Sequence, residues 1–261
     1  MHDFHPVCPS HNLFNADSRY CGVPDDPNVC NACLKSNPHS QSTIKDILQW
    51  RELWASVLVN INEIRCFSED SAVHFKKAYP ELSDSVVVIP HDRRVVPGDF
   101  GGDLQRRKTE KDGTPTVAVI GNISPAKGAP VVDLLAGETD LELVVVGKVP
   151  PNEGWDFPGV TVHGPYEVGD LPKLLSEYEA DLILIPSLWP ETYNFVADEA
   201  MSMDLPILSF DIGAHAARLR EYHTAKLIPL ELSDDSEALD REIRSFHASL
   251  VDRKKAVDEA S

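Results

Sequence analysis

Two glutamates in one polar segment have the residue type and spacing that ligand chemistry needs. Glu191 and Glu199, with seven residues between them, lie in residues 186–200, Pro-Ser-Leu-Trp-Pro-Glu-Thr-Tyr-Asn-Phe-Val-Ala-Asp-Glu-Ala. In a helix, eight steps of 100° would bring the second carboxylate about 80° round and about 12 Å further along the axis. One carboxylate could then accept hydrogen bonds from a sugar and the other from a ribose, while amides of residues 192–195 hold a phosphate. A capping glutamate followed by a surface glutamate is the alternative interpretation.

Apolar runs on either side predict how this segment is positioned. Leu-Ile-Leu-Ile at 182–185 and Ile-Leu-Ser-Phe at 207–210 are short, continuous and apolar, and a helix-length stretch separates them. This arrangement is typical of a βαβ unit. Ligands of such units lie beyond the carboxyl ends of the strands. The loop with Glu191 is therefore where we expect the chemistry.

A second loop suits an anion. Gly-Asn-Ile-Ser-Pro-Ala-Lys-Gly at 121–128 follows an apolar run. Gly121 permits close approach of a ligand to the backbone, Ser124 and the following proline favour a helix start, and Lys127 adds a positive charge. The combination suits a diphosphate, although it is neither a Walker loop nor a Gly-x-Gly-x-x-Gly motif. An ordinary strand-to-helix turn with a solvated lysine is the alternative.

Four of the five cysteines lie in the first 33 residues, spaced Cys-x12-Cys-x8-Cys-x2-Cys. They are Cys8, Cys21, Cys30 and Cys33. Thiolates suit tetrahedral zinc, and a structural metal would stabilise a segment rich in Pro, Asp, Asn and Ser. The spacing is not a standard two-knuckle pattern, so free thiols and disulfides stay open as alternatives. A thioredoxin-like redox pair is disfavoured, because no strand leads directly into the Cys-x-x-Cys.

Composition limits the classes of partner. The 261 residues allow one large domain or two ordinary ones, and the formal net charge is −18. Such a charge disfavours nucleic acid and anionic lipid surfaces as broad partners. No apolar stretch approaches the roughly 20 residues that cross a bilayer, and the first residues lack the basic start and apolar core of a signal peptide. We expect a cytoplasmic protein, with peripheral contact with a membrane left open.

Periodicity predicts an α/β protein in four parts. Residues 1–91 are expected to begin with an irregular loop over 1–41 and to continue as a partial α/β domain. Residues 92–114 are rich in Gly, Arg and Lys and are expected to form a linker. Residues 115–232 are expected to form a Rossmann-like domain with a parallel sheet covered on both faces. Residues 233–261 are expected to form a final charged, amphipathic helix.

The expected elements follow from the same patterns. Candidate strands of the Rossmann-like part are 117–120, 141–146, 160–162, 182–185, 207–210 and 226–228. In the first part, strands are expected at 64–67 and 86–89, and helices at 42–60 and 68–79. Ser42 or Thr43 is the expected N-cap of the first helix, and Ser68 that of the second.

The motifs resemble a known family. The segment 186–193, the Glu-x7-Glu pair, Asp-Ile-Gly-Ala at 211–214 and the loop 121–128 are similar to retaining glycosyltransferases of the two-Rossmann (GT-B) type, in the group 1 family. His-Gly-Pro-Tyr at 163–166 resembles that family's nucleotide-contacting turn. The resemblance covers residues 115–230. Upstream, His2-Asp3-Phe4, Cys8-Pro9-Ser10, Trp50-Arg51 and Pro90-His91 resemble the latter part of the acceptor domain. The resemblance thus implies a GT-B fold with one complete Rossmann-like domain and a partial N-terminal domain that lacks its first half.

The family resemblance also implies roles for individual residues. Lys127 would bind the donor diphosphate, Glu191 would contact the transferred sugar and Glu199 the ribose. His2 would face the acceptor, so that Glu191, Lys127 and His2 are the candidate catalytic residues. The candidate donor-binding residues are Gly121, Ser124, Lys127, Gly164, Tyr166, Glu191, Thr192, Tyr193, Asn194, Phe195 and Glu199. Transfer would proceed with retention by front-side attack, with no cofactor, and Glu191 would stabilise charge instead of acting as a nucleophile.

Trp189 and His91 each have a structural role as an alternative to a functional one, and Asn122 departs from the family pattern. Trp189 could line the sugar pocket or only shape its loop. His91 closes a strand at the expected domain junction, where a hinge role is favoured over a catalytic one. Asn122 stands where the family often has Arg, which removes one phosphate contact.

The resemblance implies transfer of a sugar from a nucleotide-sugar donor to a glycan or lipid-linked acceptor, in cell-surface polysaccharide synthesis. A non-catalytic nucleotide-sugar-binding or scaffold fragment is one alternative, favoured by the missing half domain. A sugar-nucleotide epimerase of the same architecture is another, disfavoured by the Glu-x7-Glu segment. The sequence leaves open the donor, the acceptor and the oligomeric state.

Overall fold

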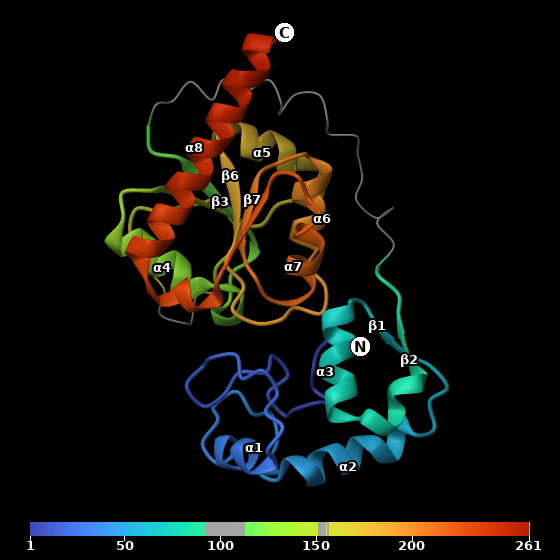
Figure 1. The fold of residues 1–261 in the computed structure, drawn as a ribbon. Coiled ribbons are helices and arrows are strands. Elements are labelled where there is room, and N and C mark those ends of the chain that lie inside the picture. Colours follow the sequence, from blue (N-terminus) through green and yellow to red (C-terminus); the bar gives the residue numbers. More distant parts are fainter. Residues whose placement is uncertain (92–112, 151–154, 156, 261) are drawn as a thin grey trace. The chain divides into compact units, whose positions relative to one another are not determined.

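The computed structural model describes residues 1–91, 113–150, 155 and 157–260, with side chains of the last helix described as far as residue 253. The chain divides into two compact units (Figure 1). The first comprises Met1–Asp92, Leu188–Asn194 and Ile212–Ala217, and the second comprises Arg93–Ser187, Phe195–Asp211 and Arg218–Ser261. Most of the predicted linker, 92–114, lies outside the described residues, and the domain boundaries expected from the sequence stay predictions.

The second unit contains a six-stranded sheet whose neighbouring strands are all parallel. The strands are β3 (Thr116–Asn122), β4 (Glu142–Lys148), β5 (Thr161–Val162), β6 (Leu182–Ile185), β7 (Ile207–Phe210) and β8 (Ala225–Ile228). Their order is β5-β4-β3-β6-β7-β8, so the direction of winding reverses between β3 and β6. The six predicted strands are confirmed, and the α/β class with them. Ligands of such sheets bind beyond the carboxyl ends of the strands, beside the reversal.

Helices cover both faces of this sheet, as predicted (Figure 1). They include α4 (Ala129–Glu138), α5 (Leu171–Glu177), α6 (Phe195–Ser202) and α8 (Ser236–Ala260). α4 and α8 lie on one face, and α5 and α6 lie on the other. A short helix, α7 (Gly213–Leu219), is divided between the two units. α8 begins three residues later than residue 233, because the 3₁₀ turn η6 (Leu230–Asp234) precedes it.

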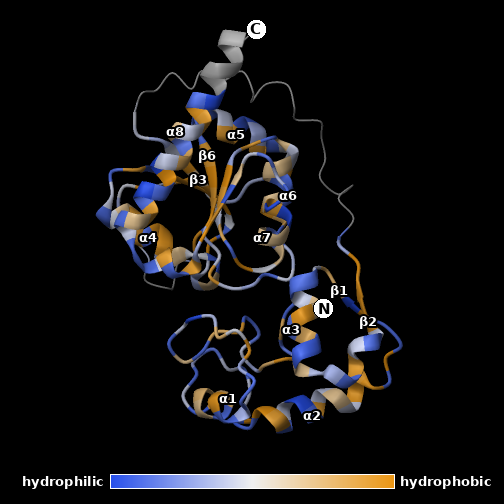
Figure 2. Cartoon of the chain, in the orientation of Figure 1, coloured by the Kyte–Doolittle hydropathy of each residue, from blue (hydrophilic) through white to orange (hydrophobic). Residues whose placement is uncertain are grey.

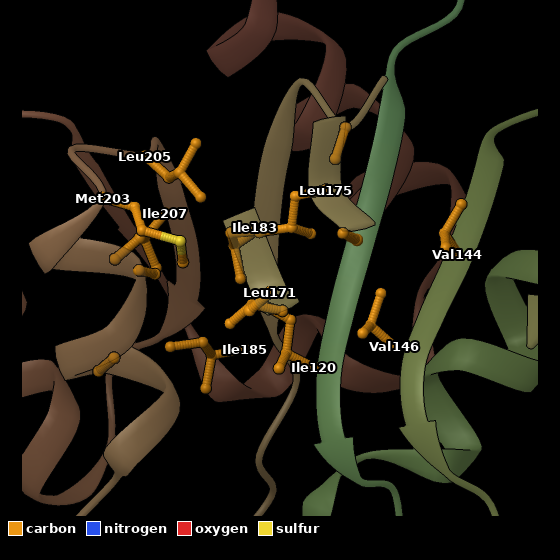
Figure 3. Packing of buried hydrophobic residues seen from close by; sticks show 14 of the residues in the cluster. Ile120, Val144, Val146, Leu171, Leu175, Ile183, Ile185, Met203, Leu205 and Ile207 are labelled. Carbon is orange, nitrogen blue, oxygen red and sulfur yellow. The ribbon is translucent and has the colours of Figure 1, made fainter. Parts of the chain in front are cut away.

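Branched apolar side chains form the core between the sheet and α5 (Figure 3). Ile120, Ile183 and Ile185 from the central strands pack with Leu171 and Leu175, and each side chain is at most 5% exposed. Figure 2 shows that the central strands are apolar, whereas the outer helices mix apolar and polar residues. Burying one such side chain contributes about 1.5–3 kcal/mol. This core holds the strand ends, and with them the loops that carry the candidate site.

The first unit is a smaller α/β arrangement. Its elements are α1 (Pro27–Leu34), α2 (Ile47–Leu58), β1 (Ile64–Cys66), α3 (Glu69–Ala78), the 3₁₀ turn η1 (Pro80–Ser85) and β2 (Val86–Val88). β1 and β2 pair in parallel, at the predicted places. The predicted cap of α3 is confirmed, since Ser68 Oγ accepts a hydrogen bond from the Ser71 amide at 3.1 Å.

Two expectations for this unit are wrong. α2 begins at Ile47, because the Asp46 carboxylate accepts hydrogen bonds from the amides of Leu48 and Gln49 and so acts as the N-cap in place of Ser42 or Thr43. Residues 1–41 are not wholly irregular, because Asp26 and Pro27 begin helix α1.

The first 41 residues share a hydrophobic core with the α3 region. Phe4, Val7 and Leu13 are fully buried in one cluster with Phe75 and Tyr79 of the α3 region. The Tyr79 hydroxyl donates a hydrogen bond to the Pro6 carbonyl at 2.6 Å. Apolar packing and this hydrogen bond therefore help to hold the segment against the α3 region.

None of the helices in the described part of the chain combines the length and the apolar character that crossing a membrane requires.

Candidate functional site

The loop predicted to hold a diphosphate lies at the carboxyl end of β3, and the helix that starts after Ser124 is only a short 3₁₀ turn. Residues 125–127 form the 3₁₀ turn η4 (Pro125–Lys127), and α4 begins only at Ala129. The amides of Lys127 and Ala129 donate to the Ser124 carbonyl at 2.9 and 3.1 Å. These two amides are used within the loop, and Lys127 is the charged residue of the loop.

A glycine joins this loop to the segment that carries the glutamates. Gly128 has φ +92°, and a Cβ on it would lie 2.2 Å from the Pro186 carbonyl oxygen. Only glycine tolerates both this φ and this approach. The predicted phosphate loop and the end of β6 are therefore in contact within the second unit.

Two predicted donor-binding residues are brought together in the second unit. Tyr166, in the turn after β5, donates a hydrogen bond from its hydroxyl to Glu199 Oε2 on α6 at 3.4 Å. Burial raises the pKa of the Tyr166 phenol, and the neighbouring Glu199 carboxylate raises it further, so the phenol keeps its proton. The Glu199 carboxylate is thereby left with free lone pairs for other donors.

Burial also raises the pKa of Glu199 above its ordinary 4.5. An acid whose folded-state pKa is raised lowers the stability of the fold once it ionises, because the folded protein holds the proton more tightly than the unfolded chain. We therefore expect Glu199→Gln to melt at a higher temperature than the wild type at neutral pH. The difference should vanish below about pH 4.5, where both states of the wild type are protonated. Thermal melting between pH 4 and 8 measures this, and a pH-independent difference would contradict it.

A cavity of about 350 Å³ opens beside Tyr166. It is lined by His163, Pro165, Tyr166, Glu167, Asp170, Lys173 and Leu174. The walls combine a lysine, two carboxylates and an imidazole with the apolar Pro165 and Leu174, which suits a flat ring bearing polar groups. Gly164, predicted as a donor contact, has φ +90° and makes the turn into this cavity. Asp170 and Lys173 were not predicted; their only signal is the start of a helix directly after the motif.

Glu191 lies in the loop 188–194, not on a helix. α6 begins at Phe195, so the helical estimate of its separation from Glu199 is wrong. Glu191 is 4% exposed, and its Oε1 accepts a hydrogen bond from Asn194 Nδ2 at 2.8 Å. The physical reason for the loop is a distant contact: the Ala214 amide donates to the Glu191 carbonyl at 3.0 Å, and Gly213 (φ +72°) packs against Pro190. The result is a buried carboxylate in a fixed position.

The neighbours of Glu191 have different surroundings. The Thr192 hydroxyl donates to the His2 carbonyl at 2.8 Å, and Thr192 is 5% exposed. The Tyr193 ring is buried, whereas Phe195 is 53% exposed. Within the first unit, the structure thus brings Glu191, Thr192, Tyr193 and Asn194 together with His2.

The structure does not support the predicted zinc site. Cys8, Cys21, Cys30 and Cys33 are free cysteines, and among residues 1–91 and the other described residues no group of three or more His, Cys, Asp or Glu could hold a metal ion. Cys8 and Cys30 instead pack against Leu34, Ile47 and Trp50. Burial, together with the neighbouring thiols of Cys21, Cys30 and Cys33, raises the pKa of the Cys8 thiol to about 12. The spacing of the cysteines could not reveal this apolar packing.

A family model described as "Glycosyl transferases group 1" matches residues 114–248. No curated protein sequence matched the chain.

Solved structures of low identity share the fold. Anabaena HepE in complex with UDP is 18% identical with a TM-score of 0.50, over 80% of this chain and 67% of that one. Its complex with UDP-glucose is 16% identical with a TM-score of 0.51, over 80% of this chain and 68% of that one. A glycosyltransferase from Rickettsia africae is 16% identical with a TM-score of 0.56, over 77% of this chain and 57% of that one. Sucrose-phosphate synthase from Thermosynechococcus elongatus is 16% identical with a TM-score of 0.54, over 83% of this chain and 63% of that one. The GT-B type of α/β fold predicted from the sequence is confirmed, and the chain spans about 57% to 68% of the length of these proteins.

Proposed function

Because the chain belongs to the glycosyl transferases group 1 family, we propose that it binds a nucleotide-sugar donor and transfers the sugar to an acceptor with retention of configuration. The observation that carries this proposal is the Tyr166–Glu199 pair beside the 350 Å³ cavity. The pair lies in the half of the chain that the family model matches. It offers a ring-sized space next to a carboxylate with free lone pairs.

The donor would be held by complementary groups of the second unit. The Glu199 carboxylate accepts hydrogen bonds from the two vicinal hydroxyls of the ribose, and Tyr166 orients that carboxylate. The base occupies the adjoining cavity. Lys127 offsets the charge of the diphosphate, a role that matters more because the amides of Lys127 and Ala129 are already used within the loop.

Glu191 would act on the sugar. Its carboxylate is buried, so its charge is little screened by water and is strongly felt by a cationic sugar in the transition state. In the proposed front-side step the bond from the anomeric carbon to the diphosphate breaks, and the acceptor oxygen bonds to the same face. The acceptor proton goes to the departing phosphate oxygen. No carbon–oxygen bond to Glu191 forms.

The proposal names the acceptor only by its chemical class. His2 is the candidate acceptor residue, and a glycan or lipid-linked acceptor in cell-surface polysaccharide synthesis follows by analogy with the family. A cytoplasmic location with peripheral membrane contact stays a prediction. The complexes of Anabaena HepE make UDP-glucose the first donor to test and UDP the first nucleotide.

Calorimetric titration with UDP, GDP, ADP and dTDP tests donor binding. We expect one nucleotide to bind saturably, and Lys127→Ala and Glu199→Ala each to weaken it about tenfold, the usual size for one charge-assisted hydrogen bond. Lys45→Ala, which removes an exposed lysine of the first unit, is the matched control and should bind as the wild type does. Binding of none of the four nucleotides would overturn the donor site and favour the scaffold alternative.

A further inference from the structure

The loop that carries Glu191 is packed against aromatic rings of the first unit, to which residues 188–194 belong. His91 lies edge-on to Tyr193 with ring centroids 4.6 Å apart, and it stacks on Phe67 at 3.9 Å. Phe67 also lies 6.5 Å from Tyr193, edge-on. His2 completes the group, 5.0 Å from Phe67. We call His2, Phe67, His91 and Tyr193 the Tyr193 cluster.

A small parallel sheet holds two members of this cluster in register. Phe67 directly follows β1, and His91 follows β2 by three residues. β1 and β2 pair in parallel, and the Ile89 amide extends the pairing by donating to the Cys66 carbonyl at 2.9 Å. The carboxyl ends of parallel strands lie at the same end of a sheet, so the β1–β2 pair holds Phe67 and His91 side by side there.

The loop is attached to this surface at consecutive residues. Thr192 donates its hydroxyl to the His2 carbonyl at 2.8 Å, and Tyr193, 8% exposed, contributes its ring. On one side of them is Glu191, and on the other is Asn194, which hydrogen bonds to the Glu191 carboxylate. A displacement of Tyr193 would therefore move both the carboxylate and the amide that orients it.

We propose that His91 is a positioning residue for Glu191. Its ring, supported by Phe67, holds Tyr193 and thereby sets the place of the Glu191 carboxylate toward the sugar of the donor. The contact of Glu191 with the sugar rests on the proposed function. The packing of His91 against the loop does not depend on that function. His91 is thus assigned a contact with the site loop, where the sequence favoured only a hinge.

Hydrogen exchange of the ligand-free protein tests the holding of the loop. His91→Ala removes the ring, and we expect amides of residues 191–194 to exchange about tenfold faster, the size that follows from losing an aromatic pair. His91→Phe keeps a flat ring against Phe67 and Tyr193 and should restore the exchange rates of the wild type. The matched control is His39→Ala, which removes a histidine that lies edge-on to Phe14 at 5.3 Å instead of to Tyr193.

Titration of the same variants with UDP and with UDP-glucose tests the consequence for the sugar. We expect His91→Ala to lose about fivefold in UDP-glucose affinity relative to UDP, with UDP itself unchanged, and His91→Phe to lose neither. Unchanged exchange in His91→Ala, or faster exchange throughout the first unit, overturns the positioning role. Faster loop exchange in a protein whose wild type binds UDP and UDP-glucose equally well overturns the sugar contact of Glu191 and leaves the loop contact standing.

Discussion

Glu191→Gln is expected to lower kcat for sugar transfer about 100-fold or more, with little change in the KM of the donor. The expected size is that of removing one preorganised group that stabilises charge in a transition state. The carboxylate is 4% exposed and hydrogen bonded to Asn194, so its charge acts at close range with little screening. Glutamine has the same shape and can still accept the hydrogen bond from Asn194, which confines the change to the charge.

Initial rates of nucleotide release and of product formation measure this effect. Glu52→Gln, an exposed glutamate on α2, is the control and should keep the rate of the wild type. Thermal melting of both variants checks that the fold is intact. A rate loss of less than about threefold in a folded Glu191→Gln protein would show that charge stabilisation by Glu191 is not part of the reaction.

Gly128→Ala is expected to lower the free energy of unfolding by about 3 kcal/mol or more. The new Cβ would lie 2.2 Å from the Pro186 carbonyl oxygen and 2.5 Å from its Cβ, and φ +92° adds backbone strain for any L side chain. The atoms in the way belong to backbone and a proline ring, which cannot rotate aside. Pro186 directly follows β6, so relief of the clash would have to move the phosphate loop away from the core.

Urea unfolding measures this loss of stability. Gly137→Ala is the matched control, because no atom lies within 4 Å of its added Cβ and its residue lies in α4. We expect the free energy of unfolding of Gly137→Ala to equal that of the wild type or to exceed it by up to about 1 kcal/mol, because alanine has a higher helix propensity than glycine. Equal midpoints for the two variants would contradict the close approach of Gly128 to Pro186.

The sheet of the second unit was predictable because its strands are continuous apolar runs. Leu-Ile-Leu-Ile at 182–185 is a short apolar run typical of a strand buried on both faces, and the structure buries all four residues. The family motifs also located the turn with Gly164 and Tyr166. Local sequence is enough for such features, because strand burial and turn geometry depend on residues that are neighbours in the chain.

The geometry at Glu191 was not predictable from its own segment. Residues 191–194 have no strong helix-breaking pattern, yet Gly213 and Ala214, about twenty residues away in the sequence, hold them as a loop. The zinc prediction, which the structure does not support, has a similar cause. The order of cysteines in a sequence does not show that Cys8 and Cys30 pack against Trp50 and its neighbours.

By itself, the sequence determined the parallel sheet, the family and which residues carry charge near the strand ends. These depend on hydrophobic patterning and on short motifs, which are local properties of the chain. Only the tertiary structure decided that Tyr166 meets Glu199, that Asn194 orients Glu191 and that His91 packs against Tyr193. Tyr166 and Glu199, like His91 and Tyr193, are separated by tens of residues and meet through packing of distant elements, while the Asn194–Glu191 pair depends on the loop that Gly213 and Ala214 hold. Their geometry therefore follows from the whole fold and from no single segment.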